Sequence, residues 1–494
     1  MSNEKYKLHP VTAIINVVKA LKDLLIPIAI ILLANGFNLN FDYRDEKFFG
    51  EMVPLIFLVV IVVWTMINGL IKWATFTYWF EDSELRVEYG LLVKKKRYIP
   101  FERIQNLNYK EGIFHRIFKL VQVQVETAGS KNGKPEAELT AVTREAADEI
   151  ELRMKRAKQK ETLIEIDETT QEVSIEVEED PSTIVHKMKV PELILLATTS
   201  SGVGVVLAGV FAVVSQFAEF IPFDFIFDEV AFLWKYSFIA VAILIAMALL
   251  LTWIISVGLT FLNYYDFTVT KQSNRLIITR GLIEKKRVTI PINRVQAIKI
   301  VENPFQQILG LASIAVESAG GGFSGEADKK IILFPLIAKK EALEPLLELF
   351  PEYDFTMRPA VKPPKRAQSF FYRIDFLWLI PTIGAVSYFF YPYGLLSLLL
   401  IVPIIILGRW QFKTTGYTIG NQQITIVSRF ISRVTFFAKK KRIQVTESSQ
   451  SYFQKRKRIG SAKIVVMSGM TGASAIVRHI EHEEVEKILT WYES

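Results

Sequence analysis

The 494-residue sequence contains no cysteine. Disulfide bridges, zinc sites with thiolate ligands and cysteine nucleophiles are therefore excluded. The Walker phosphate loop, the GxSxG nucleophile elbow and the HExxH metal motif are also absent from the sequence. Because no common catalytic signature is present, we expect a protein that is not an enzyme and that uses no cofactor and no metal.

Charged side chains are missing from several long stretches. The uncharged runs are residues 24–41, 52–71, 193–218, 236–265 and 376–408, and the last run is broken at Tyr391-Pro-Tyr-Gly394. A helix of about 20 apolar residues crosses the hydrocarbon core of a bilayer. We therefore expect six transmembrane helices in three hairpins. The two halves of the last run are short, so that hairpin either borrows neighbouring residues or is re-entrant.

The same runs hold almost no ionisable group. Proton- and ion-coupled transporters usually need carboxylates or basic side chains within the membrane as relays. A transporter or another lipid-handling membrane component is therefore the alternative interpretation, and a scaffold or binding protein is the main one.

Basic residues show how the chain is oriented. They are abundant at the N-terminus and in the long segments after each hairpin, whereas the short loops inside the hairpins are acidic or uncharged. Lys and Arg collect on the cytoplasmic side of a membrane. We expect a multi-pass protein with both termini and all three long segments in the cytoplasm. The net charge of +8 then fits an anionic inner leaflet better than nucleic acid.

One stretch of the sequence occurs three times. Residues 90–129 return as residues 281–320, which lie 191 residues later, without a gap. Both copies read as glycine, a Lys/Arg run, and then Ile-Pro-x-x-Arg-(Ile or Val)-Gln. A third copy keeps Arg442-Ile-Gln444 and, after a two-residue insertion, residues 460–466. Self-similarity of this kind indicates one module that is used three times.

Each copy has the pattern of short strands followed by one helix. In the second copy, alternating β-branched runs cover residues 267–270, 275–279, 287–292, 313–318 and 330–334, and the terminal helices are expected at 143–160, 338–350 and 478–492. Such strands, closed by a C-terminal helix, indicate a small barrel or sandwich of the pleckstrin-homology (PH) type. The expected fold class is an α+β membrane protein with three helical hairpins, each followed by a cytoplasmic PH-like domain.

This organisation divides the chain into eight segments. They are 1–74 (N-terminal segment and first hairpin), 75–160 (PH-like domain 1), 161–189 (charged linker), 190–263 (second hairpin), 264–350 (PH-like domain 2), 351–369 (Pro-rich basic linker), 370–410 (third hairpin) and 411–494 (PH-like domain 3).

These motifs carry a resemblance to a known family. Paired spans, Ile-Pro-x-x-Arg-Ile-Gln, a short helix and Gly310-Leu-Ala312 resemble the second class of bacterial PH-like domains, and the whole chain is similar to the YdbT-type membrane proteins. The resemblance implies a non-enzymatic scaffold of the bacterial cytoplasmic membrane. It also implies a smaller one-domain partner of the same PH-like type and a role in immunity or resistance to membrane-active bacteriocins, with an antimicrobial peptide as a possible ligand.

Three basic runs are the candidate contacts for anionic lipid headgroups or a partner. The candidate residues are Lys94, Lys95, Lys96, Arg97, Lys285, Lys286, Arg287, Lys439, Lys440, Lys441 and Arg442. Basic residues near an anionic membrane surface contribute about 1 kcal/mol each. Two alternatives stay open: the lysines protect an edge strand against pairing, or they add to the positive-inside signal. The third run does not align with the first two, which argues against one shared binding site.

Histidines offer a weaker signal. His479 and His482 are expected one turn apart on the terminal helix, where they could hold a metal, but no third ligand follows at a known spacing. His115 is replaced by Gln306 and Gln454 in the other copies, so a function shared by the three modules does not depend on an imidazole. The glutamine of the repeated Arg-(Ile/Val)-Gln motif is expected to close a buried backbone hydrogen bond.

Overall fold

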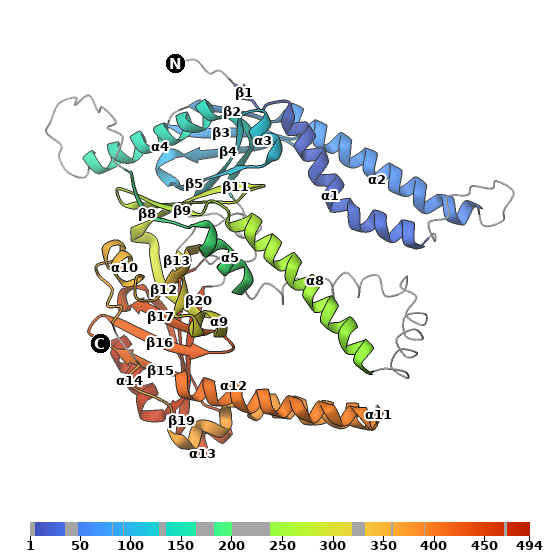
Figure 1. Cartoon of the computed structure of the whole chain (residues 1–494). Helices are drawn as coiled ribbons and strands as arrows, with labels where there is room; N and C mark the ends of the chain where they lie inside the picture. The colour runs from blue at the N-terminus through green and yellow to red at the C-terminus, as the bar shows by residue number, and fades with distance from the viewer. Residues whose placement is uncertain are drawn as a thin grey trace.

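The computed structural model describes residues 5–34, 48–81, 83–91, 93–127, 135–164, 182–199, 238–318, 331–356, 359–389, 391–468 and 472–494. Three β-rich lobes are stacked one on the next, and the long helices leave them toward the same side, the right of the view in Figure 1. We call the lobes modules 1, 2 and 3 in chain order.

Module 1 begins with a strand that precedes the first hairpin. Its elements are β1 (Tyr6–Lys7), α1 (Val11–Ala34), α2 (Phe48–Thr75), β2 (Thr77–Glu81), β3 (Glu84–Tyr89), β4 (Lys95–Pro100), η1 (Phe101–Arg103), β5 (Ile104–Glu111), α3 (Ile113–Ile117), β6 (Leu120–Thr127), β7 (Ala137–Thr143) and α4 (Arg144–Ile164). Side chains alternate along β3, where Leu85 and Val87 are buried and their neighbours are not. The strand therefore has one face in the core.

Modules 2 and 3 repeat this order. Module 2 contains β8 (Ser182–Lys187), α5 (Val190–Thr199), α8 (Phe238–Tyr264), β9 (Thr268–Gln272), β10 (Arg275–Arg280), β11 (Lys285–Pro291), η3 (Ile292–Arg294), β12 (Val295–Glu302), α9 (Pro304–Ile308), β13 (Leu311–Ser318), β14 (Ile331–Ala338) and α10 (Leu343–Leu349). Module 3 contains η4 (Lys365–Phe371), α11 (Arg373–Phe389), η5 (Tyr393–Leu400), α12 (Ile401–Thr414), β15 (Gly416–Ile419), β16 (Gln423–Arg429), β17 (Arg433–Lys439), η6 (Lys440–Arg442), β18 (Ile443–Ser449), α13 (Tyr452–Arg456), β19 (Ile459–Val466), β20 (Ala473–Glu481) and α14 (His482–Glu493).

The repeated glycine before the basic run serves a tight turn. Gly90 and Gly281 have φ values of +105° and +106°, a region that favours glycine because it has no Cβ. A Cβ on Gly90 would meet the carbonyl oxygen of Val93 at 2.2 Å, and one on Gly281 would meet that of Glu284 at the same distance. The same turn therefore joins β3 to β4 and β10 to β11.

Two of the sheets contain strands from two different modules. The strand orders are β1-β2-β3-β4, β7-β6-β5-β11-β10-β9-β8, β14-β13-β12-β17-β16-β15 and β18-β19-β20. The first sheet of module 2 continues the second sheet of module 1 through β5 and β11, and module 3 joins module 2 through β12 and β17. Neighbouring modules are thus linked by backbone hydrogen bonds as well as by side chains.

The hydrophobic cores also interlock at the second junction. Phe437 of module 3 packs into the core cluster of module 2, and Ala297 of module 2 belongs to the core cluster of module 3. Both side chains are at most 1% exposed. The two modules therefore share apolar burial, which favours a stack with a defined geometry.

The structure accounts for part of the predicted membrane region. Three described helices are long and apolar enough to cross a bilayer, namely Ile56–Thr75, Ile243–Tyr264 and Gly394–Thr414, and a bent pair at residues 365–389 would be a fourth. Residues 35–47 and 200–237 lie outside the described residues, so six spans in three hairpins stay a prediction.

The expected strands of module 2 are confirmed, and each module ends in a helix. The strands before the hairpins were not predicted. β8 lies inside the segment 161–189, which was expected to be a linker, and Val361 of the segment 351–369 forms a bridge to Tyr417.

Candidate functional site

The three basic runs occupy different places in the stack. Lys95, Lys96 and Arg97 belong to β4, which pairs only with β3 among the described strands. Lys285–Arg287 opens β11, which is paired on both sides. A strand with this basic run can therefore be paired on both sides, as β11 is, so edge protection by lysines does not account for the repeated run.

The third run lies at the junction of modules 2 and 3. Lys441 forms an ion pair of 2.9 Å with Glu352, and the Arg442 guanidinium donates to the carbonyl oxygen of Asn293 at 2.7 Å. The Lys439 ammonium lies 5.3 Å from the ring centre of Tyr353. The hydrogen bond from Lys441 lowers the pKa of the Glu352 carboxyl. Lys440 packs near Trp491 of its own module.

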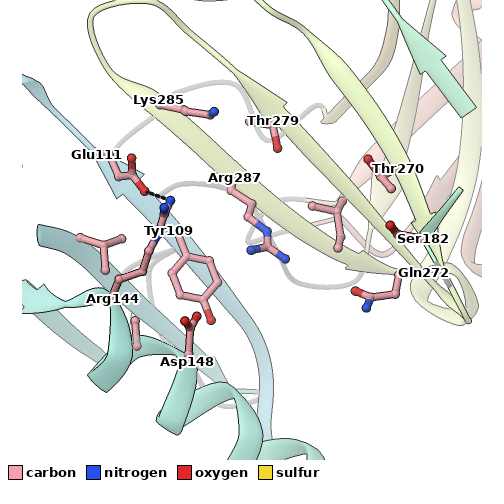
Figure 2. Close-up of a pocket in the computed structure, with 13 residues that line it drawn as sticks. Tyr109, Glu111, Arg144, Asp148, Ser182, Thr270, Gln272, Thr279, Lys285 and Arg287 are labelled. Atoms are coloured by element: carbon pink, nitrogen blue, oxygen red, sulfur yellow. Dashed lines mark hydrogen bonds and ion pairs between the residues drawn. The ribbon is translucent and has the colours of Figure 1, made fainter. Parts of the chain in front are cut away.

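A cavity of about 420 Å³ lies at the seam between modules 1 and 2. Figure 2 shows Tyr109 and Glu111 on β5, with Arg144 and Asp148 on α4, facing Lys285 and Arg287 on β11. Ser182, Thr270 and Gln272 close the side formed by β8 and β9.

Several charged side chains of this junction cavity have partners of opposite charge or aromatic partners. Arg144 pairs with Glu111 at 2.8 Å, and the Arg287 guanidinium lies 5.5 Å from the Tyr109 ring centre. Burial, and then Glu151, raise the pKa of the Tyr109 hydroxyl well above its usual value. That hydroxyl therefore stays protonated and donates to Glu151 at 2.9 Å. Both hydrogen-bonded pairs lie within module 1, and the contact of Arg287 with Tyr109 is the one that reaches across from module 2.

Buried ionic groups support the junction of modules 2 and 3. Lys299 pairs with Glu317 at 2.6 Å, and both side chains are nearly inaccessible. The hydroxyl of Ser468, from module 3, donates to the second oxygen of Glu317 at 2.5 Å. Glu302, also buried, pairs with Lys339 at 2.6 Å and with Arg433 of module 3 at 3.5 Å. Buried charges need such partners, because an uncompensated one costs several kcal/mol.

A second cavity, of about 700 Å³, lies at the foot of the first hairpin. Helices α1 and α2 contribute the apolar side chains Ile15 and Trp64 next to several polar ones, and the sheet provides a polar floor with Gln122 and Glu138. Gln122 donates to Glu138 at 2.6 Å. The side-chain hydroxyl of Thr12, on the helical side, is buried and has no hydrogen-bond partner within the described structure.

Cationic groups line the same hairpin-foot cavity. Lys19 and Lys72 extend from the two helices and are exposed. Arg97, the last residue of the first basic run, also lines the cavity and is hydrogen-bonded to the carbonyl oxygen of Glu136. Apolar side chains next to several cations suit a molecule with an anionic head and an apolar tail.

His115 and its counterparts have a structural role in all three modules. Each accepts a hydrogen bond from the backbone N–H that begins a short helix: Gly112 to His115 at 3.3 Å, Asn303 to Gln306 at 3.2 Å, and Ser451 to Gln454 at 2.7 Å. Imidazole and amide are interchangeable for this purpose, since each has an acceptor at the right reach. Sequence reasoning missed this shared role, although the three aligned positions held the signal.

The expected histidine pair does not form on the terminal helix. His479 belongs to β20, and only His482 lies on α14, because the helix begins four residues later than predicted. The His479 Nδ1 accepts a hydrogen bond from the Gln454 side-chain amide at 2.9 Å, and the ring packs against Phe371. No group of three potential metal ligands occurs in the part of the chain that the structure describes.

The repeated glutamine closes a local hydrogen bond in module 2. The Gln296 amide donates to the carbonyl oxygen of Arg294 at 3.0 Å. Gln296 is buried, whereas Gln105 is half-buried and Gln444 is exposed. The structural interpretation of the motif therefore holds for the second copy.

Two comparisons place this architecture among known proteins. The family model described as "Bacterial PH domain" matches residues 23–158, 192–349 and 376–494. The chain is also similar to the UPF0699 transmembrane protein YdbT of Bacillus subtilis (strain 168), with 36% identity over 500 residues. That alignment covers 100% of this chain and 99% of the relative.

Proposed function

Because the chain belongs to the family of bacterial PH-domain transmembrane proteins that includes YdbT, we propose that it is a non-enzymatic membrane scaffold. Its PH-like modules lie on the cytoplasmic side, as the positive-inside distribution favours. The scaffold acts in resistance to membrane-active bacteriocins together with a smaller membrane protein of one PH-like domain.

The continuous sheets between the modules are the observation that supports a scaffold. Two junctions join three modules into one stack whose long helices leave on the same side. Such an arrangement holds three membrane-attached lobes at set distances, which suits binding of a partner, a lipid surface or an incoming peptide. The described residues contribute paired charges and apolar cores at these junctions.

Survival under a pore-forming bacteriocin tests the proposal. Deleting the gene should lower survival, and the wild-type gene should restore it. Glu302→Lys places a third cation beside Lys339 and Arg433 and should weaken the second junction, so it should fail to restore survival. Glu149→Lys, on the exposed face of α4, is the matched charge reversal and should restore it. Unchanged sensitivity after deletion, alone or with any neighbouring one-domain gene, refutes the resistance role.

The hairpin-foot cavity favours a second candidate function, the binding of an anionic lipid. Its apolar side chains, which include Trp64, its cations Lys19 and Lys72, and the unsatisfied Thr12 hydroxyl fit a phospholipid headgroup with the start of its chains. The purified full chain should bind a fluorescent phosphatidylglycerol more tightly than phosphatidylcholine. Lys19→Gln with Lys72→Gln should remove most of this preference, and Lys187→Gln, at an exposed site in module 2, should not. Equal binding of both lipids refutes lipid recognition at this cavity.

A further inference from the structure

The two junctions between modules use the same register. At the first junction Lys285 of β11 lies opposite Glu111 of β5. At the second junction Arg433 of β17 lies opposite Glu302 of β12. Glu302 follows Glu111 by the repeat distance of 191 residues, and Arg433 follows Lys285 by 148, the same distance that separates Arg294 from Arg442. Equivalent residues of the repeat therefore meet at both junctions, so the contact is a property of the module.

Each end of the stack has a strand equivalent to one side of this contact, and neither strand has the corresponding partner among the described strands. β4 of module 1 is the counterpart of β11 and β17, and β18 of module 3 is the counterpart of β5 and β12. Among the described strands, β4 pairs only with β3 and β18 pairs only with β19.

Exposure confirms that β18 lacks the cover that β12 has. Val445 is 44% exposed, whereas its counterpart Ala297 is fully buried. Glu447 is likewise exposed, whereas its counterpart Lys299 is buried. On β4, Tyr98 is 55% exposed. An apolar or aromatic side chain on an open strand edge is a common feature of strands that pair with another chain.

We propose that β4 of one copy of this chain pairs antiparallel with β18 of a second copy, in the register of the two internal junctions. The chain carries both halves of the contact, one at each end, so every copy can bind a copy on either side. This contact is heterologous, and it builds a head-to-tail row or a closed ring. Because all copies are attached to one membrane, their strand edges meet at the same height above it.

The register brings complementary residues together. It places Arg97 opposite Glu447, Lys96 opposite Ser448 and Lys95 opposite Ser449. Opposite charges that lie directly across two strands attract, and they share one face of the sheet. The same register sets Ile99 opposite Val445, an apolar pair. The lysines of β4 do not prevent pairing, because the equivalent basic residues of β11 lie in a paired strand.

The absence of cysteine provides a clean background for a cross-linking test. Residues opposite each other in antiparallel strands have Cα atoms about 4.5–5.5 Å apart, within the range that a disulfide spans. Two differently tagged full-length copies are co-expressed, one with Lys95→Cys and the other with Ser449→Cys, and the membranes are oxidised. The expected product is a disulfide-linked dimer that carries both tags. Lys286→Cys with Lys110→Cys in one chain occupies the same two repeat positions at the first junction and serves as the positive control.

A one-residue shift provides the negative control. Lys95→Cys with Ser448→Cys puts the two thiols on opposite faces of the strands and should lose the cross-link. The proposal is overturned if both pairs cross-link equally, or if the matched pair gives no product while the positive control does. It is also overturned if Lys95→Cys is captured by another membrane protein and not by Ser449→Cys, which would make that protein the occupant of the edge.

Charge exchange tests the register independently. Arg97→Glu, in the Lys95→Cys copy, should lower the dimer yield about fivefold, which corresponds to ~1 kcal/mol for a cross-strand charge pair. Glu447→Arg in the Ser449→Cys copy should restore the yield. A yield that Arg97→Glu leaves unchanged, or that Glu447→Arg fails to restore, refutes the pairing of these two residues. The inference does not depend on a role in bacteriocin resistance.

Discussion

Removing the Lys299 ammonium should weaken the second junction more than any exposed ion pair could. Lys299 and Glu317 lie 2.6 Å apart, with side chains that are 11% and 3% exposed. Lys299→Met would leave the Glu317 carboxylate buried with Ser468 as its remaining partner. Breaking a buried pair in this way costs about 3–5 kcal/mol. The side chains are too little exposed for solvent to screen much of this penalty.

Replacing both partners should cost far less than replacing one. With Lys299→Met and Glu317→Met together, no charge is left buried, and the main loss is the hydrogen bond from Ser468, about 1 kcal/mol. The matched control is Lys463→Met, which removes an exposed pair with Glu447 at 3.0 Å on the neighbouring sheet. Exposed pairs contribute about 0–1 kcal/mol.

Thiol labelling can measure these differences in the full-length protein. Val316→Cys places a single thiol at a fully buried position of β13, and the labelling rate then reports how often the junction opens. Each 1.4 kcal/mol corresponds to a factor of ten, so Lys299→Met should speed labelling by roughly 10²- to 10³-fold or more. The double variant should fall within about tenfold of the parent. If Lys299→Met labels no faster than Lys463→Met, or the double variant is as fast as the single one, the reasoning is wrong.

Three further substitutions test local features. Gly281→Ala should lower the free energy of unfolding by at least about 1 kcal/mol, because the φ of Gly281 is positive and an added Cβ would meet the Glu284 carbonyl. Gly258→Ala is the control: the space around Gly258 is open, so this variant should not lower the midpoint of thermal unfolding. His115→Gln should keep the midpoint of the parent, because glutamine caps the same helix in the other modules, whereas His115→Ala should cost about 1 kcal/mol; equal midpoints for the two variants contradict the cap. Burial, and then Arg478, lower the pKa of His479 from 6.5 to about 4. The neutral form is therefore favoured in the folded state, and its stability contribution is full above pH 6.5 and is lost as the pH falls toward 4. His479→Gln should flatten the stability profile in that window by up to ~3 kcal/mol, and exposed His482→Gln is the control; a profile that His479→Gln leaves unchanged refutes this account.

The basic runs show that the local sequence does not determine how a strand is paired. Lys94–Arg97 and Lys285–Arg287 occupy the same place in the repeat, so the sequence predicts the same environment for both. Among the described strands, β4 pairs only with β3, whereas β11 lies in the middle of a seven-stranded sheet. The difference arises because β11 follows a module whose strand β5 it pairs with, whereas β4 belongs to the first module. The position of the module in the stack, and not the sequence of either basic run, therefore decides the environment.

The short strands before the hairpins illustrate a second limit. β1 has only two residues and β8 has six, and neither shows an alternating pattern strong enough to predict a strand. Each forms because the chain passes the edge of its own sheet before it enters the hairpin. Similarly, Lys299 and Glu317 look like ordinary polar residues of two strands in the sequence. Module 3 contacts both in the structure: Phe436 of β17 lies against Lys299, and Ser468 donates to Glu317.

The sequence by itself determined the repeat, the strand pattern, the terminal helices, the apolar runs and the family, because these depend on the order and spacing of residues along the chain. The tertiary structure alone decided which strands of one module meet those of the next, which basic residues are covered, and which described strands pair on one side only. Pairing between strands joins residues more than a hundred positions apart, and the free energy that selects a partner comes from burial and hydrogen bonds that exist only after the modules stack.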